Sequence, residues 1–237
     1  MVEPLLEIAG LSKAFTAPGG ERTNVIEVSH FSITPQEHVA LQGASGSGKT
    51  TFLNLIAGIL QADRGKIVVA GAEMTALSES GRDRLRASKI GYVFQNFNLL
   101  QGYTALENVL LGMVFGKGPD IAYARHLLES VGLESRLNYR PAQLSIGQQQ
   151  RVAVARALAN KPLLVLADEP IGNLDEFHAA EALTLIRDVC RKRGAALLLV
   201  SHDPQILNTF PRLEQFSSIN RAAPHATHAA VSMAGNA

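Results

Sequence analysis

The sequence predicts an α/β protein with a mainly parallel β-sheet. Short apolar runs bounded by glycine, proline and polar residues alternate with longer helical patterns, which is typical of strand-helix-strand units. The first 35 residues contain apolar runs that indicate paired strands, and residues 96–159 are mostly helical in pattern. We therefore expect a parallel core with an N-terminal antiparallel β part and an inserted α-helical subdomain.

The individual elements follow in chain order. The runs "LLEIAGL" and "NVIEVSHFSI" are expected to pair as the N-terminal strands. Further strands are expected at 38–42, 66–70, 89–94, 162–168 and 195–201, and helices at 50–60 and 176–193. The basic run 81–89 is interpreted as a solvated helix face.

The length of 237 residues suits one domain with an inserted subdomain. We place that domain at 1–220, with its core in 1–95 and 160–220 and its helical subdomain in 96–159. Residues 221–237 are small and polar with little to bury, so we expect a mobile C-terminal tail.

Composition excludes several classes of protein. A net charge of +1 provides no broad basic field, so nucleic acid is not expected as a partner. The single cysteine, Cys190, cannot form an internal disulfide or a cysteine-rich metal site. No apolar run approaches the roughly 18 residues that a membrane span needs, and the N-terminus lacks the pattern of a signal peptide.

Residues 43–50, "GASGSGKT", match the phosphate-binding pattern G-x-x-x-x-G-K-[ST] between an expected strand and an expected helix. Its glycines let successive N–H groups converge on one anion, and the helix start adds a positive dipole end. Lys49 would reach the β and γ phosphates, and the Thr50 hydroxyl would hold Mg²⁺. The expected nucleotide-binding residues are Gly43, Ala44, Ser45, Gly46, Ser47, Gly48, Lys49, Thr50 and Thr51.

Polar residues follow three expected strands at the sheet edge where parallel α/β sheets bind ligands. Asp168 and Glu169 end the apolar run "LLVLADEP", so Asp168 would orient Mg²⁺ and Glu169 would polarise an attacking water. His202 would sense the γ-phosphate, and Gln95 would touch both Mg²⁺ and the water. The alternative interpretation is structural: two capping acids, a lone histidine and a solvated glutamine.

The stretch "QLSIGQQQR", from Gln143 to Arg151, predicts a second helix start. Ser145 and Gln148 have capping-box spacing, and Ser145, Gly147 and Gln148 would form an anion site without a lysine. A nucleotide gripped by Lys49 has its γ end facing away from its own loop. We therefore expect the second start to meet the nucleotide of another copy in an antiparallel dimer, the alternative being only a well-capped helix.

Six motifs occur in the order found in the ATP-binding subunit of an ABC transporter, which the sequence resembles over about residues 3–216. They are a Walker A motif at 43–50, a Q-loop glutamine at Gln95, a signature "LSIGQ" at 144–148, a Walker B motif at 163–168 followed by Glu169, "GNLD" at 172–175, and His202. "FQNFNLL", "TALENVLL" and "ADEPIGNLD" resemble the subgroup that serves lipoprotein-releasing and macrolide-export systems.

The resemblance implies a P-loop NTPase (RecA-like) core that hydrolyses ATP with Mg²⁺. It also implies that Phe15 stacks on adenine, that Asp175 communicates across the dimer, and that the subunit is peripheral on the cytoplasmic face of the inner membrane. One departure is Ile146, where the family usually has glycine. A β-branched residue disfavours positive φ and adds bulk near a phosphate, so we expect the anion site at this second helix start to be weakened.

Transport would require separate transmembrane permease subunits. We expect them to dock near residues 95–115, with Phe97, Leu99, Leu100 and Tyr103 as exposed contacts. A mechanical or regulatory ATPase of the cell-division type remains the alternative. A chromosome-structure ATPase would need long coiled-coil arms, and a nucleotide kinase would lack the signature at 144–148. Cargo and direction of transport stay open.

Overall fold

A computed structural model of the chain describes residues 3–172, 176–203, 207 and 209–222. Within them lie a four-stranded antiparallel sheet of order β2-β1-β4-β5 and a five-stranded parallel sheet of order β6-β7-β8-β3-β9. The strands are β1 Leu6–Thr16, β2 Arg22–Ile33, β3 His38–Gln42, β4 Arg64–Val69, β5 Ala72–Glu73, β6 Ile90–Val93, β7 Leu164–Asp168, β8 Ala196–Ser201 and β9 Arg212–Gln215.

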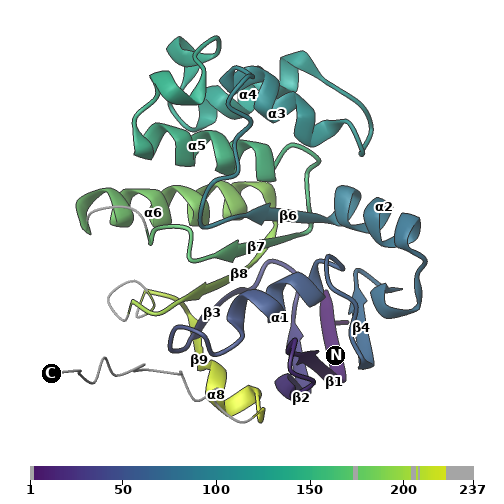
Figure 1. Cartoon of the computed structure of the whole chain (residues 1–237). Helices are drawn as coiled ribbons and strands as arrows, with labels where there is room; N and C mark the ends of the chain where they lie inside the picture. The colour runs from purple at the N-terminus through teal and green to yellow at the C-terminus, as the bar shows by residue number, and fades with distance from the viewer. Residues whose placement is uncertain (1–2, 173–175, 204–206, 208, 223–237) are drawn as a thin grey trace, which may run out of the picture.

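Helices lie on both faces of the parallel sheet. The helices are α1 Lys49–Ile56, α2 Glu79–Lys89, α3 Ala105–Met113, α4 Ile121–Ser130, α5 Ile146–Ala157, α6 Glu176–Arg193 and α8 Phe216–Ile219. Figure 1 shows α6 on one face, with α5, α3 and α4 stacked beyond it, and α1 on the other face. The P-loop NTPase core and the helical insert that the sequence predicts are therefore confirmed.

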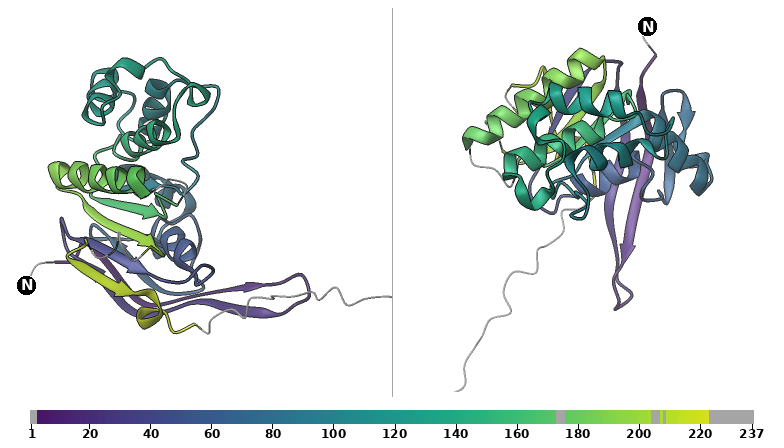
Figure 2. Two further views of the ribbon diagram at one scale, coloured as in Figure 1. Left: turned by 90° about the vertical axis from the view of Figure 1, so that its left-hand side faces the viewer. Right: turned by 90° about the horizontal axis from the view of Figure 1, so that it is seen from above.

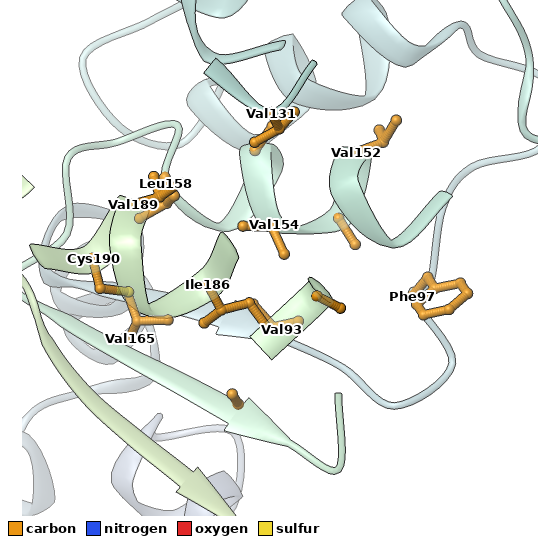
Figure 3. Packing of buried hydrophobic residues seen from close by; sticks show 14 of the residues in the cluster. Val93, Phe97, Val131, Val152, Val154, Leu158, Val165, Ile186, Val189 and Cys190 are labelled. Carbon is orange, nitrogen blue, oxygen red and sulfur yellow. The ribbon is translucent and has the colours of Figure 1, made fainter. Parts of the chain in front are cut away.

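The central parallel strands β3, β7 and β8 are buried on both faces, which explains their continuous apolar runs. Along β7, Leu164 and Leu166 pack into the same cluster as Phe52 of α1, on one side of the sheet. Their neighbour Val165 points the other way and packs with Ile186 of α6 and with residues of α5 (Figure 3). This alternation fixes which helices lie on each side of the carboxyl edge of the sheet.

The antiparallel strands form a long ribbon. β1 and β2 pair from Leu6 with Ile33 to Thr16 with Arg22, and the end of the ribbon projects beyond the rest of the molecule in Figure 2. The pairing predicted for these two runs is confirmed.

Three details differ from the sequence prediction. The strand expected at 66–70 is β4, which pairs antiparallel with β1 and so does not join the parallel sheet. The first core helix ends at Ile56 because Gly58 follows with φ 65°, a left-handed value that stops a helix. The parallel sheet gains β9, whose short polar sequence "RLEQ" gives no strand pattern.

Other expectations are confirmed. The helix 176–193 has the predicted bounds, and α2 buries none of its residues, as a solvated helix face should. Among the described residues, none of the helices is both long and apolar enough to cross a bilayer. The tail predicted at 221–237 falls mostly on residues 223–237, which lie outside the described residues.

Candidate nucleotide-binding site

The loop between β3 and α1 leaves the first N–H groups of α1 open. Its N-cap residue is Gly48, with φ 97° and no side chain that could cap the helix. Gly46 has φ 76°, and a Cβ on Gly43 would lie 3.0 Å from the Ser47 hydroxyl oxygen. Larger residues would therefore strain or fill this loop. The sequence folds here into a cradle for an anion at a helix N-terminus.

Lys49 is held inside this cradle and is only 5% exposed. Its Nζ donates to the carbonyl oxygens of Gly43 at 2.7 Å and Ala44 at 2.8 Å. The same Nζ lies 3.4 Å from Glu169 Oε1. The Ser47 hydroxyl is buried without a hydrogen-bond partner among the described residues. A phosphate group would satisfy that hydroxyl and compete with the loop carbonyls for the ammonium.

Asp168 ends β7 beside the start of α1. Thr50 Oγ1 donates to Asp168 Oδ1 at 3.1 Å, which joins the two predicted Mg²⁺ ligands directly. Burial raises the pKa of Asp168, and the neighbouring Glu169 raises it further. A bound cation would favour the ionised carboxylate again. One carboxylate and one hydroxyl fit Mg²⁺, which takes its remaining oxygens from water and phosphate.

Glu169 and His202 form a pair at the same edge. His202 Nδ1 lies 2.6 Å from Glu169 Oε2. Glu169 has φ 42°, which is unfavourable for a residue with a Cβ, and its N–H donates to the Val200 carbonyl at 3.0 Å. Strain of this kind persists where the surrounding contacts impose it, commonly at functional sites.

Gln95 reaches the same place from β6, which ends two residues earlier at Val93. A Cβ on Gly172 would lie 3.4 Å from Gln95 Nε2 and 3.8 Å from Glu169 Oε2. The amide therefore lies beside the carboxylate across Gly172. The structure brings together Lys49, Thr50, Asp168, Glu169, His202 and Gln95 as the sequence predicts.

The second helix start lies apart from this cluster. Ser145 Oγ accepts from Gln148 N at 3.3 Å, and Gln148 Oε1 accepts from Ser145 N at 3.0 Å, so the predicted capping box is formed. The α5 start opens on a cavity of about 290 Å³. Its lining comprises Gly132, Leu133, Ser145, Gly147, Gln148, Gln150, Arg151, Val154, Glu181, Ala182 and Leu185, with no residue of 43–51.

The backbone argument about Ile146 is wrong. Ile146 is the first residue of α5 and does not have positive φ, so its position needs no glycine conformation. Its side chain is 54% exposed at the helix start. Only the bulk of this side chain can affect a phosphate there.

Comparison with known proteins identifies the family. A model of the ABC transporter family matches residues 26–172, more than half of the chain. The chain is also 44% identical, over 89% of each chain, to the lipoprotein-releasing system ATP-binding protein LolD of Anaeromyxobacter dehalogenans. The chain belongs to the ABC transporter family. It is an ATP-binding subunit of that family, an ATPase, as its motifs predict.

Solved structures agree with this assignment. The cassette resembles a dimeric structure of a post-hydrolysis state of the ATP-binding cassette MJ0796 bound to ADP and Pi. The TM-score is 0.81 at 33% identity, covering 89% of this chain and 93% of that one. A second structure, the dimeric MJ0796 bacterial ABC transporter cassette, gives the same values.

Two polar residues of α5 were missed by the sequence analysis. Gln150 is buried, and its Nε2 donates to the Pro170 carbonyl at 2.6 Å, directly after Glu169. Arg156 donates to the carbonyl oxygens of Phe97 at 2.5 Å and Asn98 at 2.6 Å, in the loop after Gln95. Both carbonyl residues have positive φ. The signal in the sequence was a glutamine just before, and an arginine within, the buried "VAVARAL" helix pattern at 152–158.

The remaining predicted residues have mixed outcomes. Phe15 is 43% exposed and pairs across the ribbon with Thr23, two residues from Val25, which contacts Gly48. Asp175 lies outside the described residues. The expectation that Phe97 and Leu99 are exposed is wrong, because both are buried in the core cluster that joins the helical insert to α6 and the parallel sheet. Figure 3 shows Phe97 at the edge of this cluster. Leu100 and Tyr103 are exposed as expected.

Proposed function

We propose that this cassette closes with a second copy around two ATP molecules and drives a separate permease that releases lipoproteins or exports related hydrophobic cargo. One observation carries the dimer. None of Lys49, Thr50, Asp168 and Glu169 lines the cavity at the α5 start, so one nucleotide bound by Lys49 does not fill that cavity within a single copy. The likeness to a lipoprotein-releasing ATP-binding protein supports the cargo class.

The roles of the residues follow from their contacts. When ATP binds, Lys49 Nζ gives up its hydrogen bonds to the Gly43 and Ala44 carbonyls and binds the β and γ phosphates. Residues 43–51 supply N–H and hydroxyl donors to the same phosphates. Glu169 accepts a proton from the attacking water, and His202 holds the Glu169 carboxylate in place through the 2.6 Å contact. Gln95 orients the same water from beside Gly172. Phe15 stacks on the adenine ring at the face of the β1–β2 ribbon.

Mg²⁺ is the cation that this site suits. Thr50, Asp168 and Gln95 offer it oxygen atoms only, which matches a hard cation. When bound, it neutralises charge on the phosphate oxygens. No group of three or more His, Cys, Asp or Glu residues in the described part of the chain could hold a metal by itself. Water and phosphate oxygens would supply the remaining ligands.

The dimer is antiparallel. In that arrangement Ser145, Gly147 and Gln148 of one copy approach the γ-phosphate held by Lys49 of the other copy. The role of communicating across the dimer falls to Asp175 by resemblance to the family. The likeness to two dimeric cassette structures supports this assembly. Hydrolysis removes the shared anion, so the two copies separate.

The permease docks in a groove beside the loop that carries Gln95. This cavity of about 450 Å³ lies between α2, β6 and α3 and is lined by Ile59, Tyr92, Phe94, Leu111 and Phe115 among others. Ile59 and Phe115 are exposed. An apolar helix of a partner fits such a groove, and movement of the loop after Gln95 would be felt there. Of the docking segment predicted near residues 95–115, only Leu111, Gly112 and Phe115 line this groove, and the proposal extends the docking site to α2 and β6.

Two further assignments complete the proposal. The ATPase domain spans 1–220, with the helical subdomain at 96–159 moving against the core. The subunit is peripheral on the cytoplasmic face of the inner membrane, where the permease holds it.

The test is reconstitution with the permease encoded nearest to this chain, in proteoliposomes loaded with an acylated lipoprotein. We expect ATP turnover to rise when the acylated lipoprotein is present and to stay low with the same protein lacking its acyl chains. Turnover that responds to neither cargo, but depends on the permease, would favour the mechanical ATPase instead.

A further inference from the structure

A second cavity, of about 520 Å³, lies on the other side of Phe115 from the permease groove. It is bounded by α2, the connection between α3 and α4, and the segment that leads into β7. Figure 1 shows α2 beside the β6 edge of the parallel sheet, below α3. Phe115 and Asn160 line both cavities, so the two are contiguous. The volume of this second cavity is that of a site for a small ligand or a lipid headgroup.

The cavity concentrates positive charge. Four cations line it: Arg84, Lys89, Lys117 and Lys161. None of them forms an ion pair with a residue that the structure describes. The carboxylate of Asp120 also lines the cavity, and it is engaged as the N-cap of α4, accepting from Tyr123 N at 2.9 Å. The cavity therefore carries a clear positive excess in a chain whose total charge is only +1.

The basic residues of α2 divide into two groups. Arg82 donates to the Leu77 carbonyl at 3.0 Å, and Arg86 pairs with Asp83 and donates to the Ala57 carbonyl at 3.2 Å. These two guanidinium groups are used within the fold. Arg84 and Lys89 instead line the cavity. These two cations of α2 are therefore available to an anion in the cavity.

The lining is also apolar. Met113, Phe115, Tyr123 and Leu163 belong to it, and Phe115 is 81% exposed. Val114 and Ile121, close in the chain, are 48% and 58% exposed. Lys161 Nζ lies 4.6 Å from the centre of the Tyr123 ring, so cation and ring form one surface. Large exposed apolar side chains beside lysines are typical of surfaces that contact the membrane interface.

We propose that this cavity binds the phosphate headgroup of an anionic phospholipid, with Phe115 and its exposed apolar neighbours contacting the acyl region. The inference rests on the proposed function, because docking of a permease in the adjoining groove turns this face toward the bilayer. The four cations then add attraction to an anionic leaflet, which falls off over about 8 Å at physiological salt. The lipid would orient the cassette at the membrane independently of the permease contact.

The chain offers a clean reporter because it contains no tryptophan. In a Phe115→Trp variant of the full chain, the emission comes from this site alone. We expect a blue shift and quenching by brominated acyl chains with phosphatidylglycerol vesicles, and neither effect with phosphatidylcholine vesicles. Short-chain soluble phosphatidylglycerol should shift the emission at concentrations where inorganic phosphate does not. Equal responses to inorganic phosphate would reduce the site to a general anion contact and overturn the assignment to lipid.

A charge-matched pair of variants tests the cations. Lys89→Gln, Lys117→Gln and Lys161→Gln together should weaken binding to phosphatidylglycerol vesicles by more than about tenfold. The control removes as much charge elsewhere, through Lys66→Gln, Arg125→Gln and Lys192→Gln, and should bind nearly as the parent does. Equal losses in both triple variants would mean that net charge alone is responsible, which contradicts a built site.

Two readouts separate this inference from the proposed function. ATP turnover by the cavity triple variant with detergent-solubilised permease should match the parent, because no cavity residue belongs to the nucleotide site. If ATP turnover by the parent with detergent-solubilised permease does not respond to cargo, the proposed function is wrong. Lipid binding is then still decided by the vesicle experiments. If the tryptophan of the Phe115→Trp variant is already shielded in the delipidated complex and ignores added phosphatidylglycerol, a permease segment covers the cavity and the lipid assignment is wrong.

Discussion

The N-termini of α1 and α5, the two proposed phosphate-binding helix starts, differ in which groups already accept hydrogen bonds from their first N–H groups. At α1 the N-cap is the left-handed Gly48, and Lys49 and the unsatisfied Ser47 hydroxyl lie in the same loop. At α5 the Ser145 and Gln148 side chains close a capping box. The α1 start can therefore hold a polyphosphate alone. The α5 start has fewer free donors and no lysine, so it can contribute only once another surface presents the anion.

The surroundings deepen the contrast. Asp168, Glu169 and His202 lie around the α1 start, so that end has the groups for hydrolysis. The cavity at the α5 start contains Glu181 and Arg151, which lie 3.7 Å apart and partly neutralise each other. In the proposed dimer, the α1 start of one copy binds the nucleotide and carries the groups for hydrolysis, and the α5 start of the other copy completes the site. This division can be tested by changing each start separately.

The largest effect is expected from Glu169→Gln. The amide cannot take a proton from water, so turnover should fall by about 10²–10⁴ while ATP still binds. Without hydrolysis the two copies should stay together, and gel filtration with ATP and Mg²⁺ should show a dimer. Only monomer under these conditions would contradict both the shared site and the contrast between the two starts.

Lys49→Ala should weaken the binding of ATP itself. The ammonium makes charge-assisted contacts worth about 1.5–3 kcal/mol, so ATP affinity should fall by roughly 10–100-fold. Titration calorimetry on the monomer measures this directly, with Lys192→Ala as a control on an exposed part of α6. Unchanged affinity would show that the α1 start is not the anchor.

Ser145→Asp separates capping from phosphate binding at the α5 start. Asp is as good an N-cap as Ser, so the melting temperature should not change. Its negative charge opposes the γ-phosphate of the other copy, so the ATP-dependent dimer of the Glu169→Gln chain should weaken by more than about tenfold. The monomer's affinity for ATP should stay the same. Loss of that affinity would place this start in the same copy's site.

Much of this contrast could be predicted from the sequence, because local rules govern it. Loop 43–50 requires glycines at fixed positions, and Ser145 with Gln148 forms a cap that depends only on spacing. What could not be predicted depends on tertiary packing. Three features involve partners far apart in sequence. They are the pairing of β4 with β1 in the antiparallel sheet, the burial of Phe97 and Leu99, and the hydrogen bonds from Arg156 to the loop carbonyls. Six residues converge at the sheet edge because parallel strands share one carboxyl end, a rule that needs only strand order.

Arg156→Lys tests how the two regions communicate. A lysine cannot donate to the Phe97 and Asn98 carbonyls as a fork, so at least one of these two hydrogen bonds to the loop that positions Gln95 is lost. We expect kcat to fall by about tenfold with a much smaller change in the KM for ATP, because Gln95 orients the water while Lys49 and the loop 43–51 hold the nucleotide. Arg125→Lys on the exposed side of α4 is the control. A parallel rise in KM would indicate a general structural defect instead.

The smallest effect is expected at Ile146. The position has helical backbone, so only the exposed side chain hinders a phosphate of the other copy. Removing it should raise ATP turnover in the presence of the permease by about twofold to fivefold, which corresponds to about 0.4–1 kcal/mol. Ile146→Ala and Ile146→Gly should then give similar gains, because both remove the bulk. A gain confined to the glycine variant would mean that the α5 start changes its backbone conformation when it meets the nucleotide. The helical backbone at Ile146 would then not be the conformation that binds the nucleotide.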